Sequence, residues 1–226
     1  MVTRVTGKNQ VTIPAALARE LGIVPGTKLD WCKGDEANTI SIRVKPSVDA
    51  ILREVRELGA PYRFKAKEML EDLQRMREED DPEYGAGKGA GAMSPSYLLD
   101  TSALAAHFLD EPGGAFVTDC VRKGQAALCA LTVVEFQLLL KAHGAGAAER
   151  SRVWSLCREA IRAIHPVDEA VADLAVQLRS QASERLPLAD ACIAACASRH
   201  GLVLLHGDSH YAALPASVEA IDIRTV

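Results

Sequence analysis

Hydrophobic and polar positions along the chain change their period three times. The first 45 residues alternate short runs typical of β-strands with turn signals, and the runs are TRVT, QVTI, KLDWC and TISIRV. A short helix is predicted over PAALARELG, because Pro14 suits a first helical turn and glycine suits its end. The intervening KGDEAN predicts a hairpin between the last two runs. A unit of this size buries little apolar surface, so we expect it to dimerise by sharing strands.

A helical period follows from Pro46 onward. In SVDAILREVRELG the apolar positions follow the spacing i, i+3, i+4, i+7, and FKAKEMLEDLQRM repeats it after a break at GAPYR. These patterns predict two amphipathic helices. Neither has enough sequence around it for a core of its own, so both must lie against something else. They either pack against each other as a helical hairpin or form a segment that wraps a partner, and we favour the wrapping segment.

A glycine-rich stretch, EYGAGKGAGAM, separates this helical region from the rest of the chain and predicts a flexible linker. Met93 stands where a free-standing protein would begin, which suggests two joined reading frames. From Ser96 onward, strand-like runs such as YLLD, AALCALT, LVLLHGD and AIDIRT alternate with helical stretches. Those stretches are TVVEFQLLLKAHG, AERSRVWSLCREAIRAI, DEAVADLAVQLRSQASE and PLADACIAACASRHG. The alternation predicts a parallel sheet covered by helices, whose ligands bind beyond the carboxyl ends of the strands.

Composition and charge narrow the class of protein. The 226 residues are 48% hydrophobic and 25% charged, as in ordinary globular chains. There is no apolar run of about 18 residues and no signal-peptide pattern, so we expect a cytoplasmic protein without a membrane partner. Residues 1–45 hold seven basic and four acidic side chains, and only this segment suits a polyanion. The six cysteines contain no C-x-x-C pair and indicate reduced core thiols, although Cys192 and Cys196 lie one helical turn apart and leave a metal site open.

Four carboxylates mark the predicted ligand edge of the sheet. Asp100 and Asp208 end two strand candidates, and Glu135 and Asp190 lie in the first turns of two helices. Strand ends and helix starts share one rim of such a sheet, so the four side chains can converge. Each also has a simpler interpretation, as a helix cap, a solvated helix residue or a turn residue. The strongly apolar surroundings of Glu135 and Asp190 favour the converging site, since an unpaired charge there is costly.

A cluster of carboxylates needs a cation. Two carboxylates about 5 Å apart repel by roughly 3 kcal/mol at an effective dielectric constant near 20. Such a cluster stays ionised only beside a metal ion or a basic side chain. A set of hard oxygen ligands without Cys or His favours Mg²⁺ or Mn²⁺, which activate water and stabilise the charge on a phosphodiester.

The C-terminal motifs resemble a known family. YLLDTSALAAHF, LTVVEFQLLL, LPLADACIAACASRHG and LVLLHGD resemble, in order and approximate spacing, the four acidic motifs of PIN-domain ribonucleases, the toxins of VapBC toxin–antitoxin systems. The resemblance implies that these acids ligate one or two Mg²⁺ or Mn²⁺ ions for RNA hydrolysis, with a small polar residue in support. The residues that it marks are Asp100, Glu135, Asp190, Asp208 and the supporting Ser102.

Two histidines depart from the family pattern. His206 stands where a threonine is common, and His210 stands where a further aspartate often occurs. In a continuous strand His206, Asp208 and His210 alternate on one face, which leaves a different ligand set open. Solvated histidines beside an acidic site are the simpler interpretation.

The N-terminal stretch RVTGKNQVTIPAALARELGIVPGTKLDW is similar to the AbrB or SpoVT-type swapped-hairpin domain of many VapB antitoxins. This resemblance implies binding to the major groove of operator DNA, with basic groups on phosphates and amides reading base edges. The residues that it marks are Arg4, Lys8, Asn9, Gln10, Thr12 and Arg19. Asn9 replaces a common glycine and tolerates a left-handed backbone, so the turn is expected to survive. Alternatively, Lys8 and Asn9 only form that turn.

The resemblance also assigns a role to the helical region. In VapBC systems the C-terminal part of the antitoxin wraps the toxin and places a basic side chain in the acidic site. Arg63, Lys65 and Lys67 are candidates for this inhibitory contact, with Phe64 as an apolar anchor. We favour Arg63, because a guanidinium binds two carboxylates at once. The alternative is a solvated helix face.

Together these patterns predict an α/β chain of four parts. Residues 1–45 form an AbrB/SpoVT-like DNA-binding and dimerisation domain, 46–84 a toxin-wrapping helical segment, 85–95 a linker, and 96–226 a PIN-domain ribonuclease. The leading hypothesis is a Mg²⁺- or Mn²⁺-dependent endoribonuclease inhibited by its joined antitoxin, which binds operator DNA for autorepression and self-associates as a dimer or tetramer. The alternative is a DNA-binding regulator with a catalytically inactive PIN-like oligomerisation domain.

Overall fold

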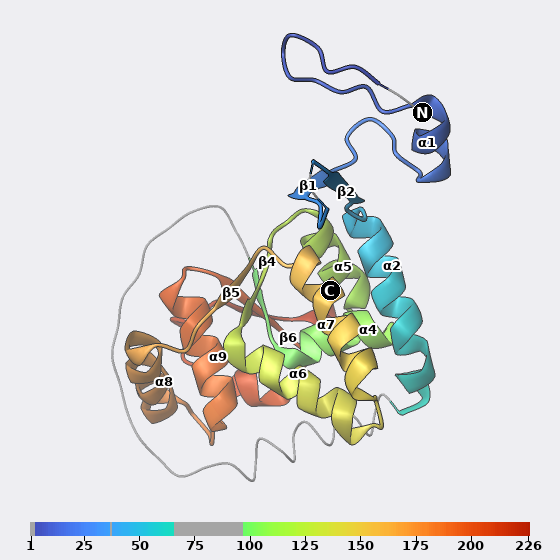
Figure 1. Ribbon diagram of the computed structural model, residues 1–226. Helices are drawn as coiled ribbons and strands as arrows, with labels where there is room; N and C mark the ends of the chain where they lie inside the picture. Colours follow the sequence, from blue (N-terminus) through green and yellow to red (C-terminus); the bar gives the residue numbers. More distant parts are fainter. Residues whose placement is uncertain (1–2, 37, 66–96) are drawn as a thin grey trace. The chain divides into compact units, whose positions relative to one another are not determined.

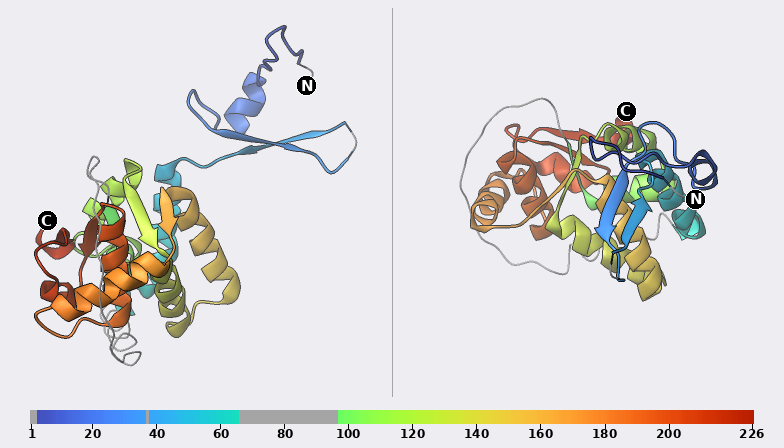
Figure 2. Two further views of the ribbon diagram at one scale, coloured as in Figure 1. Left: turned by 90° about the vertical axis from the view of Figure 1, so that its left-hand side faces the viewer. Right: turned by 45° about the horizontal axis from the view of Figure 1, so that its top comes forward.

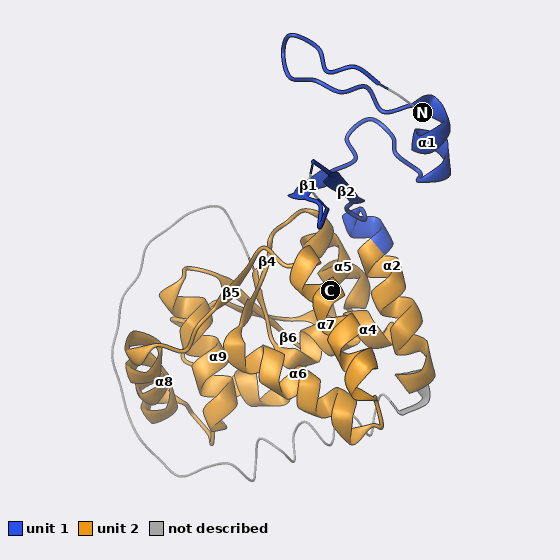
Figure 3. Ribbon diagram, in the orientation of Figure 1, with its two compact units in different colours: residues 1–50 blue, residues 51–226 orange. Residues whose placement is uncertain are grey.

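The computed structural model describes residues 3–36, 38–65 and 97–226, and the chain divides into two compact units, residues 1–50 and 51–226 (Figure 1, Figure 3). In the first unit, α1 (Ala15–Glu20) precedes an antiparallel hairpin of β1 (Leu29–Lys33) and β2 (Ile40–Val44), drawn lengthwise in Figure 2. Trp31 faces Ile42 across this hairpin. The predicted short helix and the predicted hairpin are both confirmed.

The runs TRVT and QVTI do not form strands in the single chain. They flank a turn in which Thr6 N donates to Gln10 O at 2.9 Å, and Asn9 occupies the left-handed region with a φ of 57°. Asparagine therefore supports the turn as expected. None of residues 3–36 and 38–50 is buried, and Trp31 and Ile40 are 50% and 68% exposed. A unit without its own core needs apolar surface from elsewhere, and strand sharing between two copies stays a prediction.

The second unit contains a five-stranded parallel sheet in the order β5–β4–β3–β6–β7 (Figure 1). Its strands are β3 (Tyr97–Leu99), β4 (Ala126–Cys129), β5 (Ala163–His165), β6 (Val203–His206) and β7 (Ala220–Asp222). The first strand of the unit, β3, lies in the centre and pairs with β4 on one side and β6 on the other. This order brings the ends of β3 and β6 together at one edge.

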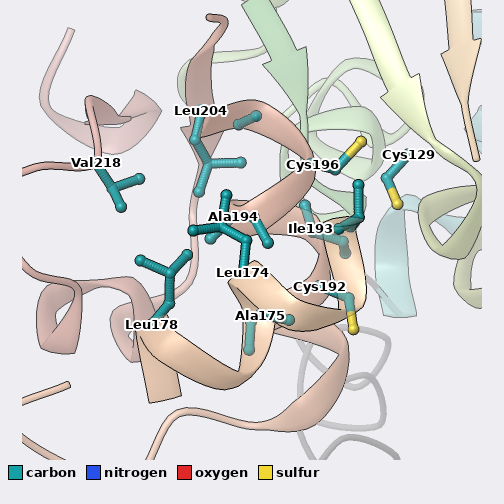
Figure 4. Packing of buried hydrophobic residues seen from close by; sticks show 14 of the residues in the cluster. Cys129, Leu174, Ala175, Leu178, Cys192, Ile193, Ala194, Cys196, Leu204 and Val218 are labelled. Atoms are coloured by element: carbon teal, nitrogen blue, oxygen red, sulfur yellow. The ribbon is translucent and has the colours of Figure 1, made fainter. Parts of the chain in front are cut away.

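Helices flank the sheet and connect its strands (Figure 2). They are α4 (Thr101–Leu109), α5 (Gly114–Arg122), α6 (Ala130–Ala142), α7 (Ala147–Ala160), α8 (Glu169–Gln181) and α9 (Leu188–Arg199), with the 3₁₀ helices η2 (Ser209–Ala213) and η3 (Ile223–Thr225). Figure 4 shows α8, α9 and β6 packed through leucine, alanine and cysteine side chains. The predicted parallel α/β architecture is confirmed.

One predicted helix is too long. The run AERSRVWSLCREAIRAI was expected to be helical throughout, but α7 ends at Ala160, Ile161 turns to an extended backbone, and Ala163 begins β5. Residues 163–165 form a strand because they pair with the free edge of β4, where Ala127 pairs with Ala163 in a parallel ladder. Tertiary pairing here overrides the local helical pattern.

The first amphipathic helix after the hairpin is confirmed as α2 (Val48–Gly59), which crosses from the first unit into the second. Ile51, Leu52 and Val55 are each at most 4% exposed. The 3₁₀ helix η1 (Ala60–Lys65) continues from it. The second predicted helix and the linker, residues 66–96, lie outside the described residues.

Five of the six cysteines lie in the core, as predicted. All six are free, and all but Cys32 are buried. Burial raises the pKa of the Cys192 thiol to about 11. Within the described ranges, Cys192 and Cys196 belong to no cluster of three potential metal ligands. No helix in the described part of the chain is long and apolar enough to cross a membrane.

Candidate active site

Four buried carboxylates lie at the carboxyl edge of the parallel sheet. Asp100 directly follows β3, Asp208 follows β6, and Glu135 and Asp190 come from the first half of α6 and α9. Their exposed fractions are 0% for Asp100 and Asp190, 2% for Asp208 and 8% for Glu135. Asp100 N donates to Leu205 O at 2.9 Å, which extends the β3–β6 ladder to this point. All four predicted acids are therefore buried, and the side chains of neighbouring residues, Thr101 and Tyr211, form hydrogen bonds to two of them, Glu135 and Asp100.

Asp100 accepts hydrogen bonds at both carboxylate oxygens. Ser102 donates to Oδ2 from its backbone N at 3.0 Å and from its hydroxyl at 2.6 Å, and Tyr211 donates to Oδ1 at 2.9 Å. The Ser102 hydroxyl also accepts from Gly207 N at 2.8 Å, although the two residues are 105 positions apart. Ser102 thus joins the start of α4 to the end of β6. Three donors from two residues hold one orientation of the carboxylate.

Glu135 is held by a residue that sequence reasoning missed. The Thr101 hydroxyl donates to Glu135 Oε2 at 2.5 Å, directly beside Asp100. The Thr132 hydroxyl donates to Leu99 O at 3.3 Å and links the first turn of α6 to the end of β3. In the sequence, Thr101 looked only like a helix-start residue, because its contact with Glu135 spans 34 positions.

His210 lies between the other two acids. Its Nδ1 atom is 3.2 Å from Asp190 Oδ2 and 3.2 Å from Asp208 Oδ1, and its backbone N donates to Asp208 Oδ1 at 3.0 Å. One donor atom from each of these three residues lies within 4.8 Å of the other two. The donor set at this edge therefore includes an imidazole nitrogen, whereas the sequence reasoning counted oxygen ligands without histidine.

The expectation of His206, Asp208 and His210 on one strand face is wrong. β6 ends at His206, and Asp208 caps η2, so His210 lies in a 3₁₀ turn. His206 Nδ1 instead contacts the Asp208 carbonyl oxygen at 2.9 Å. Burial lowers the pKa of His206, although the charge of Asp100 opposes this shift. The two histidines therefore have different surroundings.

The donor set fits a divalent cation. Buried carboxylates are stable in the charged state only with a positive partner, and the oxygens at Asp190 and Asp208 lie around one imidazole nitrogen. Carboxylate oxygens with one nitrogen are ordinary ligands of first-row divalent metals.

Two family models match the chain in separate regions. The model of the PIN domain matches residues 97–216, which is more than half of the chain and contains all four acids. The chain belongs to the PIN domain family. The model "Antidote-toxin recognition MazE, bacterial antitoxin" matches residues 2–47. A MazE/AbrB-like antitoxin domain is thus joined to a PIN domain, as the resemblance implied.

Several solved toxin–antitoxin structures are similar to part of this chain. FitAB bound to an IR36 DNA fragment is 26% identical, with a TM-score of 0.47, over 57% of this chain and 96% of that one. FitAcB from Neisseria gonorrhoeae is 25% identical, with a TM-score of 0.48, over 57% and 99%. VapBC-5 from Mycobacterium tuberculosis is 25% identical, with a TM-score of 0.42, over 57% and 98%. No curated protein gives a significant match.

PIN domains are generally nucleases that use divalent metals, and this PIN domain has the buried acidic cluster such chemistry needs. The predicted DNA-facing residues are all exposed on the first unit; they are Arg4, Lys8, Asn9, Gln10, Thr12 and Arg19. Of the predicted inhibitory residues, Arg63, Phe64 and Lys65 have their backbone in η1, and Lys67 lies outside the described residues. The roles of these residues stay predictions.

Proposed function

We propose that this chain is a toxin–antitoxin fusion whose PIN domain is a Mg²⁺- or Mn²⁺-dependent endoribonuclease. The observation that carries the proposal is the burial of four carboxylates at the carboxyl edge of the sheet in a PIN domain, two of which, Asp190 and Asp208, lie around His210. Structural carboxylates are rarely buried in such numbers without a cation. A nucleolytic metal centre accounts for their position and their burial together.

The residues of the site have separate tasks in this mechanism. Asp190, Asp208, Asp100 and Glu135 would hold the cation, which, when bound, lowers the pKa of water and stabilises the charge on a phosphodiester. Ser102 and Tyr211 orient Asp100, and Thr101 orients Glu135, through the hydrogen bonds described above. Fixed ligands need no reorganisation when RNA binds.

We further propose that α2 and η1 anchor the antitoxin to its toxin. The buried face of α2 is followed by Tyr62, whose ring lies 5.9 Å from that of Phe108 in α4. Burial raises the pKa of Tyr62, and its hydrogen bond to Glu149 of α7 adds to that effect.

Two further contacts hold α2 against the PIN domain. Arg152 of α7 donates to Glu54 of α2 at 2.9 Å. A β-carbon at Gly59 would overlap the carbonyl of Phe108, so the helix end lies directly against α4. From this anchor, Arg63 would reach the acids as the inhibitor.

The first unit supports operator binding and self-association. Its surplus of basic residues and the exposed turn at Lys8 and Asn9 suit a phosphate backbone. Its lack of any buried side chain among residues 3–36 and 38–50 supports a second copy as the partner that covers Trp31 and Ile40. A DNA-bound dimer or tetramer would repress its own transcription.

A cleavage assay tests the enzymatic part. Residues 93–226 alone should cleave RNA with Mg²⁺ or Mn²⁺ and stop with a chelator, and adding residues 1–92 should inhibit cleavage. Asp190→Asn is the matched control, because it removes the charge and keeps the shape. A folded fragment without metal-dependent cleavage would contradict the ribonuclease and favour the DNA-binding regulator with an inactive PIN-like domain.

A further inference from the structure

Three donor atoms at the sheet edge have the spacing of neighbouring ligands on one ion. Metal–ligand bonds of about 2.1 Å at right angles place adjacent ligand atoms about 3.0 Å apart. His210 Nδ1 lies 3.2 Å from Asp190 Oδ2 and 3.2 Å from Asp208 Oδ1. These two separations are close to the edge length of an octahedron, and the three donor atoms all lie within 4.8 Å of one another.

The turn that carries His210 is held at both ends. Asp208 caps it by accepting from His210 N at 3.0 Å, and the next residue, Tyr211, is 3% exposed and donates to Asp100 at 2.9 Å. The imidazole is thus attached to a segment that two of the acids themselves anchor. Its freedom to leave the space between Asp190 and Asp208 is small, which is the preorganisation a metal ligand needs.

Burial leaves one open side at this cluster. Asp190 and Asp208 are closed off by protein, whereas the His210 side chain is 23% exposed. A cation held by these three residues would therefore face solvent near His210, where water or a phosphate oxygen can complete its coordination. A purely structural ion pair does not require access to solvent on that side.

We infer that His210 is a direct ligand of the divalent cation and that an Asp–Asp–His set makes this site prefer Mn²⁺ to Mg²⁺. The inference rests on the proposed function only in taking the acidic cluster as the metal centre. Mg²⁺ demands near-ideal octahedral coordination by hard oxygen ligands, whereas Mn²⁺ is suited to carboxylates and is also the first member of the first-row series of metals that bind mixed nitrogen and oxygen sites. The histidine found where an aspartate often occurs in the family is then a determinant of metal choice.

The competing explanation is that His210 replaces the metal. As an imidazolium it would bridge Asp190 and Asp208 as an internal counter-charge, and a bound cation would have ligands of oxygen alone. The two explanations differ in whether nitrogen is bonded to the metal, which spectroscopy on Mn²⁺ reads directly.

The test is electron spin echo envelope modulation of the full chain loaded with Mn²⁺. We expect ¹⁴N coupling in the unsubstituted protein and its loss in His210→Ala. His200→Ala is the matched control and should keep the coupling, because His200 stacks on His165 at 3.8 Å and belongs to no part of this cluster. Bound Mn²⁺ without ¹⁴N coupling, or coupling that persists in His210→Ala, would overturn the inference.

Competition between the metals tests the preference. The signal of free Mn²⁺, measured with increasing Mg²⁺, should show that the unsubstituted chain binds Mn²⁺ about tenfold or more tightly than Mg²⁺, since even residues that only orient a metal ligand change metal affinity by about 10- to 100-fold. His210→Asp restores an all-oxygen set and should bring the two affinities together. An unchanged ratio in His210→Asp counts against the inference.

The same measurements in an Arg63→Ala background cover the case in which the inhibitory arginine fills the site. Failure to bind Mn²⁺ in both backgrounds also overturns the inference. The proposed ribonuclease activity is tested separately. If Mn²⁺ shows ¹⁴N coupling in a protein that cleaves no RNA, His210 is a metal ligand but the proposed function is wrong. If the protein cleaves RNA with metal but shows no ¹⁴N coupling, the proposed function stands and His210 is not a ligand.

Discussion

Acid should destabilise the PIN domain through one buried histidine, His107, that is not one of the candidate site residues. His107 of α4 is 2% exposed, and its Nδ1 lies 2.8 Å from the Thr118 hydroxyl. That hydroxyl donates to Gly114 O at 2.7 Å, so it accepts from His107, and the imidazole proton is on Nδ1. Nε2 is buried and has no hydrogen-bond partner among the described residues. A second proton on this ring would have no acceptor.

The sign and size of the effect follow from the pKa. Burial, with the positive charge of Arg56 in support, lowers the pKa of His107 to about 4 from 6.5. The unfolded chain then binds a proton at a higher pH than the folded chain does, so stability is complete above about pH 6.5 and is lost as the pH falls toward 4. Between pH 7 and pH 5 the loss from His107 is roughly 2 kcal/mol, with a ceiling of about 3 kcal/mol below pH 4.

Urea unfolding at pH 7 and pH 5 measures this loss. Trp154 in α7 reports on the second unit, and a Trp31→Phe background removes the signal of the first. His107→Asn retains a group that can bond Thr118 but does not titrate. The unsubstituted chain should lose about 2 kcal/mol more than His107→Asn between the two pH values. Equal losses would refute the assignment of a neutral, desolvated imidazole.

Three further predictions concern the anchor, the site and the DNA surface. Leu52→Ala truncates a side chain that is 4% exposed and should weaken the α2 anchor by about 2–4 kcal/mol. It should therefore raise RNA cleavage by the full chain, whereas Arg53→Ala, at an exposed position of the same helix, should not. Unchanged cleavage by folded Leu52→Ala protein would exclude α2 as the anchor. Tyr211→Phe removes only the hydroxyl that donates to Asp100 and should slow cleavage by about tenfold, a hydrogen-bond effect of roughly 1–2 kcal/mol; full activity would show that the contact is incidental. Lys8→Ala should weaken operator binding and reduce the slope of affinity against salt by about one in fluorescence anisotropy; an unaltered slope would remove Lys8 from the phosphate contacts.

Most of the fold could be predicted from the sequence, because the spacing of apolar residues that indicates helices and strands is a local pattern. Apolar residues that recur every third or fourth position predicted α2, the alternation of strand-like and helical runs predicted α9, and short apolar runs ending in aspartate predicted β3 and β6 with Asp100 and Asp208 at or just after their ends. The acids were found for the same reason, since a charge inside an apolar run is visible without a structure. β5 was missed because its strand exists only through pairing with β4.

The rest of the site depends on contacts between distant segments. Thr101 holds Glu135 across 34 positions, and Tyr211 holds Asp100 across 111, so neither role is written in its neighbours. His210 was predicted on a strand face, whereas a capped 3₁₀ turn places it between Asp190 and Asp208. The sequence by itself determined most of the helices and strands of the PIN domain and which carboxylates stand at their ends, because periodicity and side-chain chemistry act within a few residues. Only the tertiary structure decided which donors orient those carboxylates, and which histidine joins them, because hydrogen bonds depend on ångström-scale proximity that no local pattern encodes.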